Sequence, residues 1–216
     1  MEGKKLTDLR RNYDLDHLAE ETASKDPYEQ FESWLAAAVA QELEVEPNAM
    51  VLSTANEVGE PAGRVVLLKG ISNGGFIFFS NYTSNKGLEL SQNPKCALTF
   101  WWQHSHRQVR IAGRAEKVSH RDSETYFSSR PLGSQLGAIV SPQSRVIKDR
   151  TQIEKDYDQL AKEYNSDLLP EMPSHWGGYK VIPYKMEFWQ GRTNRLHDRL
   201  RYQLEDGKWH IERLAP

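Results

Sequence analysis

The chain has 216 residues, of which 38% are hydrophobic and 27% are charged, and its formal net charge is −2. This length can bury a core as one domain, and the near-neutral balance excludes a general electrostatic attraction to nucleic acid or to an anionic membrane. Any anion site must therefore be a local cluster of cations.

Three features of the sequence bear on where the protein works. No apolar run approaches the ~18 residues that span a bilayer, and the first residues lack the apolar core of a secretory signal. The single cysteine, Cys96, excludes an internal disulfide and is typical of a reducing compartment. Because it falls within an apolar strand-like run, we expect a buried, inert thiol rather than a nucleophile. These features predict a cytoplasmic protein.

Residues 1–25 are polar and rich in charge, and they are predicted to form a flexible N-terminal arm, with residues 26–216 as a single domain. The first helix begins after Asp26, which can cap it. Pro27 suits the first helical position, and Glu29 completes a capping box. The apolar stripe of this helix is predicted to face the core and consists of Phe31, Trp34, Leu35, Ala38 and Val39.

Beyond this helix the apolar residues recur with a period of two, which predicts β-strands, and Asn73-Gly74 indicates a tight hairpin turn. The predicted strands are 49–55, 63–69, 75–80, 95–102, 107–118, 176–182, 184–190, 195–205 and 208–213. The predicted helices are 84–92, a segment from Ser119 to Pro131, a segment that starts near Ser134, and a charged helix at 151–164. Successive strands without alternating helices predict a mainly β (α+β) fold, with an antiparallel barrel or closed sheet and flanking helices.

Residues 195–199 read Arg-Leu-His-Asp-Arg and are predicted as part of a strand. The side chains of Arg195, His197 and Arg199 would then share one face. Positive charges about 7 Å apart repel by about 2–3 kcal/mol at an effective dielectric near 20, so a half-dry face needs an anion or an electron-rich ring. Phe188-Trp189 upstream would add an apolar wall, which suits a phosphorylated aromatic ligand. A solvated strand face is the alternative.

Two segments in the first half of the chain carry cations where an anion could bind. Arg64 and Lys69 stand at the ends of an apolar strand. A spacing of five places them on opposite faces, so they serve different groups unless a bulge or a strand end intervenes. Lys86 follows a helix N-terminus, where free backbone N–H groups favour a phosphate. The alternatives are strand ends that simply reach solvent and an ordinary capped helix.

A third cluster lies around a break between two helices. Tyr126 and Arg130 are four residues apart and share a helix face. Pro131 then brings Ser134 to the start of the next helix, another position rich in donors. A phenol, a guanidinium and a hydroxyl are good donors to a phosphate dianion. A surface helix end is the alternative.

The run Glu187-Phe188-Trp189-Gln190, four intervening residues and Arg195-Leu196-His197-Asp198-Arg199 resembles the C-terminal signature of the pyridoxamine/pyridoxine 5'-phosphate oxidase family. The resemblance extends from about residue 26 to the C-terminus, with separated motifs in the family's order. It implies an antiparallel split β-barrel that binds FMN, and a homodimer with the flavin in a cleft between two subunits.

The resemblance also implies a role for each matching residue. The FMN contacts that it implies are Arg64, Val65, Leu67, Leu68, Lys69, Phe79, Ser80, Lys86, Gln108, Gln143, Ser144, Trp189 and Arg199. The substrate contacts that it implies are Arg10, Tyr13, Lys69, Tyr126, Arg130, Ser134, Arg195 and His197. Arg195, against the pyridine ring, and His197, on its 3'-oxygen, are the implied catalytic residues. Asn85 departs from the family, which usually has a basic residue there, and this removes a charge-assisted contact typically worth ~1.5–3 kcal/mol.

The implied activity is oxidation of pyridoxine 5'-phosphate or pyridoxamine 5'-phosphate to pyridoxal 5'-phosphate, with O2 as the acceptor and H2O2 as a product. No nucleic acid, membrane or metal partner is expected. One alternative is a different split-barrel reductase that uses FMN with another substrate, against which the substrate cluster and the Arg195/His197 pair argue. The other is a non-enzymatic carrier of flavin or vitamer, which would release no peroxide.

Overall fold

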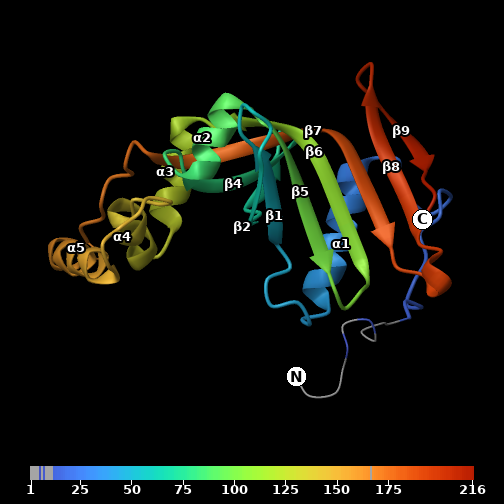
Figure 1. Cartoon of the computed structure of the whole chain (residues 1–216), viewed down its shortest axis with the longest axis horizontal. Coiled ribbons are helices and arrows are strands. Elements are labelled where there is room, and N and C mark those ends of the chain that lie inside the picture. Colours follow the sequence, from blue (N-terminus) through green and yellow to red (C-terminus); the bar gives the residue numbers. More distant parts are fainter. Residues whose placement is uncertain (1–4, 6, 8–11, 166) are drawn as a thin grey trace. The chain divides into compact units, whose positions relative to one another are not determined.

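A computed structural model describes residues 5, 7, 12–165 and 167–216 of the chain. Figure 1 traces its helices and strands along the sequence. In chain order the elements are α1 (Pro27–Ala40), β1 (Ala49–Ala55), β2 (Pro61–Leu67), β3 (Gly70–Ser72), β4 (Gly75–Asn81), α2 (Asn85–Gln92), β5 (Lys95–Trp102), β6 (Arg107–Lys117), α3 (His120–Ser129), α4 (Leu132–Val140), α5 (Arg150–Glu163), β7 (Trp176–Gln190), η2 (Thr193–Arg195), β8 (Asp198–Glu205) and β9 (Lys208–Arg213).

The nine strands of the described residues form one sheet in the order β2-β1-β5-β6-β7-β4-β3, with β8 paired to β7 and β9 paired to β8. The pairs β3–β4, β4–β7, β7–β8 and β8–β9 are antiparallel. By their internal contacts the residues group into two units. Unit 1 consists of Met1–Val51, Leu98–Ala112 and Tyr184–Pro216, and unit 2 consists of Leu52–Ala97 and Gly113–Pro183. A mainly β chain with an antiparallel sheet and flanking helices is the fold class that the sequence predicts.

Helix α1 of unit 1 begins where its capping residues predict. The Asp26 carboxylate accepts a hydrogen bond from the N–H of Tyr28 at 2.7 Å, and Pro27 is the first helical residue. The predicted capping box is wrong in one contact, because the Ser24 hydroxyl accepts from the N–H of Asp26 at 3.1 Å. The Glu29 carboxylate instead accepts from that hydroxyl, at 2.7 Å.

One side of α1 packs into the core of unit 1. The Phe31 ring lies 4.9 Å from that of Phe100, and Trp34 meets Phe188 edge-on at 5.4 Å. Val39, predicted as part of this stripe, is 54% exposed. Because successive helical residues turn by about 100°, Val39 lies roughly 80° around the helix from Phe31, at the edge of the buried side.

Two predicted strand boundaries near the C-terminus are wrong. Strand β7 runs through Pro183 without a break, because proline fixes an extended-compatible φ and removes only one ladder donor. Strand β8 begins at Asp198 rather than at Arg195, because Asn194 and Arg195 have φ angles of 55° and 62°, which a strand cannot contain. Arg195 and His197 therefore lie in the turn before β8, and the predicted shared strand face with Arg199 does not exist.

In unit 2, β3 and β4 form the hairpin predicted at Asn73-Gly74. Ser72 pairs with Gly75, and the two turn residues have φ angles of 49° and 69°. These left-handed values are those of a type I′ turn, whose twist matches that of the flanking strands. Strand β4 then pairs with β7 in a register that sets Asn81 opposite Trp176.

Two helices of unit 2 begin at hydroxyl caps, of which the sequence predicted Ser119. Ser84 caps α2 by accepting from the N–H of Gly87 at 3.4 Å, and Ser119 caps α3 by accepting from the N–H of Asp122 at 3.0 Å. Helix α4 begins at Leu132, immediately after Pro131 and two residues earlier than predicted. Residues 130 and 131 form the short link between α3 and α4, where the chain turns a corner. Several polar side chains lie at or beside this corner.

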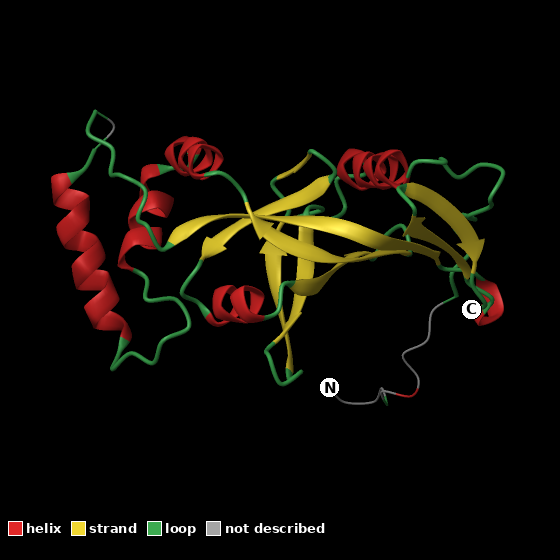
Figure 2. Cartoon of the chain, turned by 90° about the horizontal axis from the view of Figure 1, so that it is seen from above, coloured by secondary structure: helices red, strands yellow, loops and turns green. Residues whose placement is uncertain are grey.

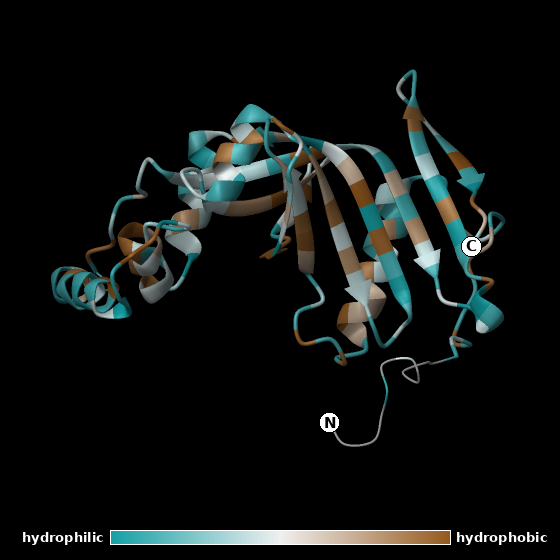
Figure 3. Cartoon of the chain, in the orientation of Figure 1, coloured by the Kyte–Doolittle hydropathy of each residue, from teal (hydrophilic) through white to brown (hydrophobic). Residues whose placement is uncertain are grey.

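Helix α5 lies beside α4 in both views of the chain (Figures 1 and 2). Its surface is largely hydrophilic (Figure 3). Ile153, Tyr157 and Leu160 are half-buried and recur at helical spacing, while no residue of α5 is fully buried. This is the charged helix that the sequence predicts.

Cys96 lies in β5 and is 8% exposed. Burial raises the pKa of its thiol to about 12, so the thiolate that would act as a nucleophile is not populated near neutral pH. The prediction of a buried, inert cysteine is confirmed. Among the described residues, no helix is both long and apolar enough to cross a membrane.

Candidate functional site

Unit 2 contains a pocket of about 910 Å³, within the size range of cofactor and small-molecule sites. Its walls come from β2, the end of β4, the start of α2, the corner between α3 and α4, and the start of β7. The predicted site residues that line it are Arg64, Val65, Leu67, Lys69, Phe79, Ser80, Lys86, Tyr126, Arg130, Ser134 and Gln143. Lining residues that the sequence did not predict are Val66, Asn81, Pro131, Gly137, Ala138, Ser141 and Trp176.

One group of lining residues joins α2 to the loop after α4. The ammonium of Lys86 donates to Oε1 of Gln143 at 2.9 Å, and the hydroxyl of Ser80 donates to the same oxygen at 3.3 Å. Burial and the nearby charge of Arg64 lower the pKa of Lys86, which the carboxylate of Glu89 partly offsets. Lys86 and Arg64 are two positive charges near each other in a partly buried position, and this arrangement favours the binding of an anion.

Arg64 is oriented by groups that the sequence did not point to. Its Nη2 lies 3.0 Å from a carboxylate oxygen of Glu89, and its Nη1 donates to the carbonyl of Leu52 at 3.2 Å and to the hydroxyl of Thr54. The same Glu89 oxygen accepts from the Thr54 hydroxyl. One carboxylate thus fixes Arg64 but cannot neutralise Arg64 and Lys86 together, so a net positive charge remains at this wall.

Arg64 and Lys69 are five residues apart, which in a regular strand would place their side chains on opposite faces. Strand β2 ends at Leu67, so Lys69 lies beyond the strand and is not bound by its alternation of faces. Both side chains line the same pocket. The sequence predicted that the two residues could serve the same group only if a bulge or a strand end lay between them, and the strand end is what the structure has.

The corner between α3 and α4, residues 130 and 131, supplies a further cation to the pocket. The Arg130 guanidinium lies over the ring of Trp176, 4.9 Å from its centroid, and its Nη1 is buried without a hydrogen-bond partner among the described residues. Tyr126 stacks on Phe79 with centroids 3.9 Å apart, and Ser134 also lines the pocket. An unpaired buried guanidinium nitrogen costs about 1–3 kcal/mol or more.

A separate cluster of rings lies in unit 1. The ring of Tyr13 lies 4.4 Å from that of His106, 5.8 Å from that of His197 and 5.9 Å from that of Trp189. Trp189 and His197 are 4.6 Å apart. Gly191 permits this packing, since a Cβ there would come within 2.8 Å of the Tyr13 side chain. His106 was not predicted, and the sequence offers no periodic or motif signal for it.

The ring of His197 has a defined hydrogen-bonding state. Its Nδ1 accepts from the N–H of Arg192 at 3.0 Å, so a neutral ring carries its proton on Nε2. Burial and the charge of Arg195 lower the pKa of His197, against the opposing effect of Asp198. The exposed edge of this histidine is therefore a neutral hydrogen-bond donor.

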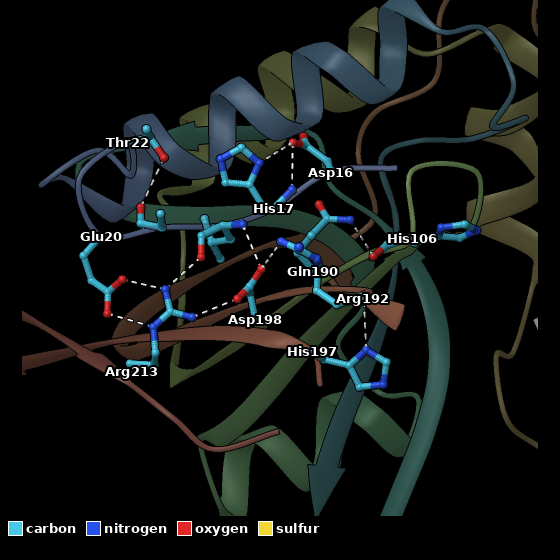
Figure 4. A network of polar contacts seen from close by, with 12 residues as sticks. Asp16, His17, Glu20, Thr22, His106, Gln190, Arg192, His197, Asp198 and Arg213 are labelled. Atoms are coloured by element: carbon cyan, nitrogen blue, oxygen red, sulfur yellow. Dashed lines mark hydrogen bonds and ion pairs between the residues drawn. The ribbon is translucent and has the colours of Figure 1, made fainter. Parts of the chain in front are cut away.

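Polar contacts tie this cluster to the segment around residue 18 (Figure 4). Asp198 accepts from the N–H of Leu18 at 3.1 Å, from Arg192 Nη1 at 3.0 Å and from Arg213 Nη1 at 2.9 Å. Arg213 also donates to the carbonyl of Leu18 at 2.9 Å and pairs with Glu20 at 2.5 Å. These bonds hold residues 18–20 against β8 and β9.

The other predicted site residues lie in varied surroundings. Arg195 is exposed in the turn before β8. Arg199 donates from Nε to Glu187 at 3.0 Å and from Nη1 to the carbonyl of Ala215 at 2.8 Å, so much of its guanidinium is already engaged. Gln108 is half-buried at the start of β6, Leu68 is buried, and Ser144 is exposed with a φ of 71°. Arg10 lies outside the described residues.

Solved structures with the same arrangement of elements define the class of protein. The fold matches that of PhzG from Burkholderia lata 383, solved in complex with tetrahydrophenazine-1-carboxylic acid, with a TM-score of 0.87 and 28% identity over 94% of this chain and 99% of that one. It also matches a pyridoxamine 5'-phosphate oxidase-related, FMN binding protein from Nostoc punctiforme PCC 73102, with a TM-score of 0.70 and 18% identity over 89% of this chain and 100% of that one. The antiparallel split β-barrel with flanking helices, predicted from the sequence, is confirmed.

Sequence comparisons then give the family. Residues 35–163 match the pyridoxamine 5'-phosphate oxidase family, and residues 176–216 match the pyridoxine 5'-phosphate oxidase C-terminal dimerisation region. A pyridoxine/pyridoxamine 5'-phosphate oxidase from Synechocystis sp. is 51% identical over 100% of both chains, and one from Azotobacter vinelandii is 52% identical over 98% of both. The chain belongs to the pyridoxamine 5'-phosphate oxidase family, a family of oxidoreductases.

Proposed function

We propose that this protein is an FMN-dependent oxidase that converts pyridoxine 5'-phosphate or pyridoxamine 5'-phosphate to pyridoxal 5'-phosphate. The alcohol and O2 would give the aldehyde and H2O2, and the amine with O2 and water would give the aldehyde, ammonia and H2O2. The observation that carries the proposal is the pocket of unit 2, which four cations from three separate segments line: Arg64 and Lys69, Lys86, and Arg130. The full-length identity of 51% to a pyridoxine/pyridoxamine 5'-phosphate oxidase supports the same activity.

The residues around Lys86 fit the phosphate of FMN. Arg64 and Lys86 bring two positive charges against the one carboxylate of Glu89, and burial together with Arg64 lowers the pKa of Lys86, as expected of a cation that lacks its anion. Ser80 and Gln143 add polar groups beside them. The chemistry that bound FMN supplies is acceptance of a hydride equivalent from the substrate and delivery of the electrons to O2.

The corner between α3 and α4 fits the phosphate of the substrate. We assign Tyr126, Arg130 and Ser134 to it, with Lys69 from the end of β2. Arg130 lines the pocket and has no ion pair among the described residues, and a guanidinium bonds phosphate oxygens strongly. The tyrosine and serine hydroxyls can donate to the remaining oxygens.

In unit 1 we assign the pyridine ring of the substrate to the turn before β8. The neutral His197, with its proton on Nε2, would donate to the 3'-oxygen of the ring and hold it in one orientation. The guanidinium of Arg195 would lie against the ring near C4', orient it and stabilise charge that develops on the substrate. No strong base is assigned, which is compatible with hydride transfer.

A peroxide assay tests this function. Purified protein is supplied with FMN, and H2O2 is measured after addition of pyridoxine 5'-phosphate. Release of one H2O2 per pyridoxal 5'-phosphate formed supports the oxidase. Binding of the vitamer without peroxide would instead indicate a carrier, and turnover only with a nicotinamide donor would indicate a reductase.

We also propose that the protein is a cytoplasmic homodimer. The match of residues 176–216 to a dimerisation region supports the dimer, and the single, buried cysteine is consistent with a reducing compartment. Light scattering coupled to size-exclusion chromatography measures the mass directly. A mass near twice the 24.9 kDa of one chain is expected, and a mass near 24.9 kDa would contradict the dimer.

A further inference from the structure

Arg130 has a firmly held backbone but a guanidinium without a counter-ion. It follows the last residue of α3, where its N–H donates to the carbonyl of Phe127 at 3.1 Å and its own carbonyl accepts from the Gln135 amide at 2.8 Å. No carboxylate among the described residues forms an ion pair with it. Burial lowers its pKa, which the nearby Tyr126 partly offsets. The groups that position the guanidinium must therefore be uncharged.

Of the two aromatic rings that the guanidinium faces among the described residues, that of Trp176 is the nearer. The Cζ atom of Arg130 lies 4.9 Å from the centroid of Trp176 and 5.9 Å from that of Phe127. An indole face attracts a guanidinium through its quadrupole, by roughly 0.5–1 kcal/mol at exposed sites and about 2 kcal/mol or more when the pair is desolvated. A carboxylate in this place would bind the same nitrogens that a phosphate needs, whereas a ring face leaves them free.

Trp176 is itself fixed from several sides. It is 6% exposed, opens β7 opposite Asn81, and donates its N–H to the carbonyl of Pro173 at 3.0 Å. Its ring lies nearly parallel to those of Phe79, at 5.5 Å and 12°, and Tyr126, at 6.2 Å and 6°. The ring therefore has little freedom to turn, and the face that it presents to Arg130 is constant.

From these contacts we infer that Trp176 is a positioning residue for phosphate binding: its ring holds the Arg130 guanidinium at the pocket without a carboxylate partner, so that the guanidinium remains able to bind a ligand oxygen. This inference rests on the proposed function, because it takes the ligand of Arg130 to be the substrate phosphate. Trp176 acts through Arg130 and needs no contact of its own with the phosphate.

The test is a double-mutant cycle on the FMN-loaded protein, read out by calorimetric binding of pyridoxal 5'-phosphate and, for comparison, of pyridoxal. Trp176→Leu should raise the dissociation constant of the phosphorylated ligand about 10-fold, and Trp176→Phe, which keeps a weaker ring face, about 2- to 3-fold. The dissociation constant of pyridoxal should not change. In the Arg130→Ala background neither Trp176 substitution should weaken binding further. Tyr164→Leu, at the end of α5, is the matched aromatic control and should leave all constants unchanged.

Three results would overturn the inference. These are additive losses in the cycle, an equal loss for pyridoxal and its phosphate, and a Trp176→Phe variant as impaired as Trp176→Leu. If Trp176→Leu fails to fold, the cycle with Trp176→Phe decides. The inference requires that the smaller loss of affinity caused by Trp176→Phe also disappears in the Arg130→Ala background. Wild-type protein that binds the phosphate selectively but releases no peroxide would refute the oxidase and leave this inference standing. No preference for the phosphorylated ligand would refute the inference itself, whatever the peroxide assay shows.

Discussion

The backbone N–H of Arg192 donates a hydrogen bond to Nδ1 of His197 across 3.0 Å. This bond requires that Nδ1 be unprotonated, so that the neutral ring donates only from Nε2. A proton added to the ring would sit on Nδ1 and turn an attractive contact with the N–H of Arg192 into a repulsive one. The same contact thus fixes both the orientation and the charge of the residue that we assign to the 3'-oxygen of the substrate.

The first prediction concerns pH. Burial and Arg195 lower the pKa of His197 from its ordinary 6.5, so the folded protein resists protonation of this ring. Because the folded pKa is depressed, the neutral form predominates at pH 6.5 and above and is lost as the pH falls through the lowered value. We expect KM for pyridoxine 5'-phosphate to be constant above about pH 6.5 and to rise below it. His197→Gln, which cannot titrate, should lose this rise in steady-state kinetics, and the exposed His210→Gln should keep it. If KM of His197→Gln still rises below about pH 6.5, the rise is due to the titration of another group.

The second prediction concerns retention of the flavin. Arg64→Ala removes one of the two cations of the proposed FMN-phosphate site, and the dissociation constant for FMN should rise about 10- to 100-fold, the loss expected for one charge-assisted contact. Flavin content after dialysis measures this. Arg150→Ala is the matched control, because that arginine is 87% exposed and, among the described residues, forms an ion pair with Glu154 alone, one turn away. Equal flavin content in wild type and Arg64→Ala would remove Arg64 from the proposed FMN site.

The third prediction concerns Arg195. Its exposed guanidinium, held in a turn with a φ of 62°, has no ion pair among the described residues. Arg195→Ala should lower kcat at least about 100-fold, the low end for a positioned catalytic group, while bound flavin stays at the wild-type level. Arg195→Lys should recover only part of the rate, because an ammonium cannot lie flat against a ring. Wild-type turnover in Arg195→Ala would show that this residue has no catalytic part.

The fourth prediction concerns stability. Asp198 accepts hydrogen bonds from Leu18, Arg192 and Arg213 while its side chain is only 19% exposed. Asp198→Asn keeps the shape but removes the charge that pairs with two arginines, which should cost about 2 kcal/mol. In a chain of this size that lowers Tm by about 4–8 °C in scanning calorimetry. Glu154→Gln, in an exposed pair, should shift Tm by less than about 2 °C. Equal shifts in the two variants would show that the Asp198 network adds no stability.

The elements that the sequence predicts best are those decided within a few residues. Asp26, Ser84 and Ser119 cap their helices because a side-chain oxygen and a nearby N–H settle the matter locally. Asn73-Gly74 turns the hairpin because few other pairs tolerate two left-handed φ angles. Many residues that line the pocket could be predicted because they lie in motifs shared with a known family.

The errors arise where tertiary contacts overrule a local pattern. Residues 195–199 alternate like a strand, yet the chain turns at Asn194 and Arg195, and β8 begins only at Asp198. Pro183 reads as a break but lies inside a strand. The contact of Trp176 with Arg130 could not be predicted, because the two residues lie far apart in the sequence and a single tryptophan carries no periodic signal.

Reduction of the flavin without O2 tests the central claim most directly. FMN-loaded protein is mixed anaerobically with pyridoxine 5'-phosphate while the flavin absorbance is recorded, and O2 is then admitted. The account predicts rapid bleaching of the yellow flavin, one pyridoxal 5'-phosphate per flavin, and full return of the colour with one H2O2 once O2 enters. A flavin that stays yellow in the presence of bound pyridoxine 5'-phosphate would contradict it.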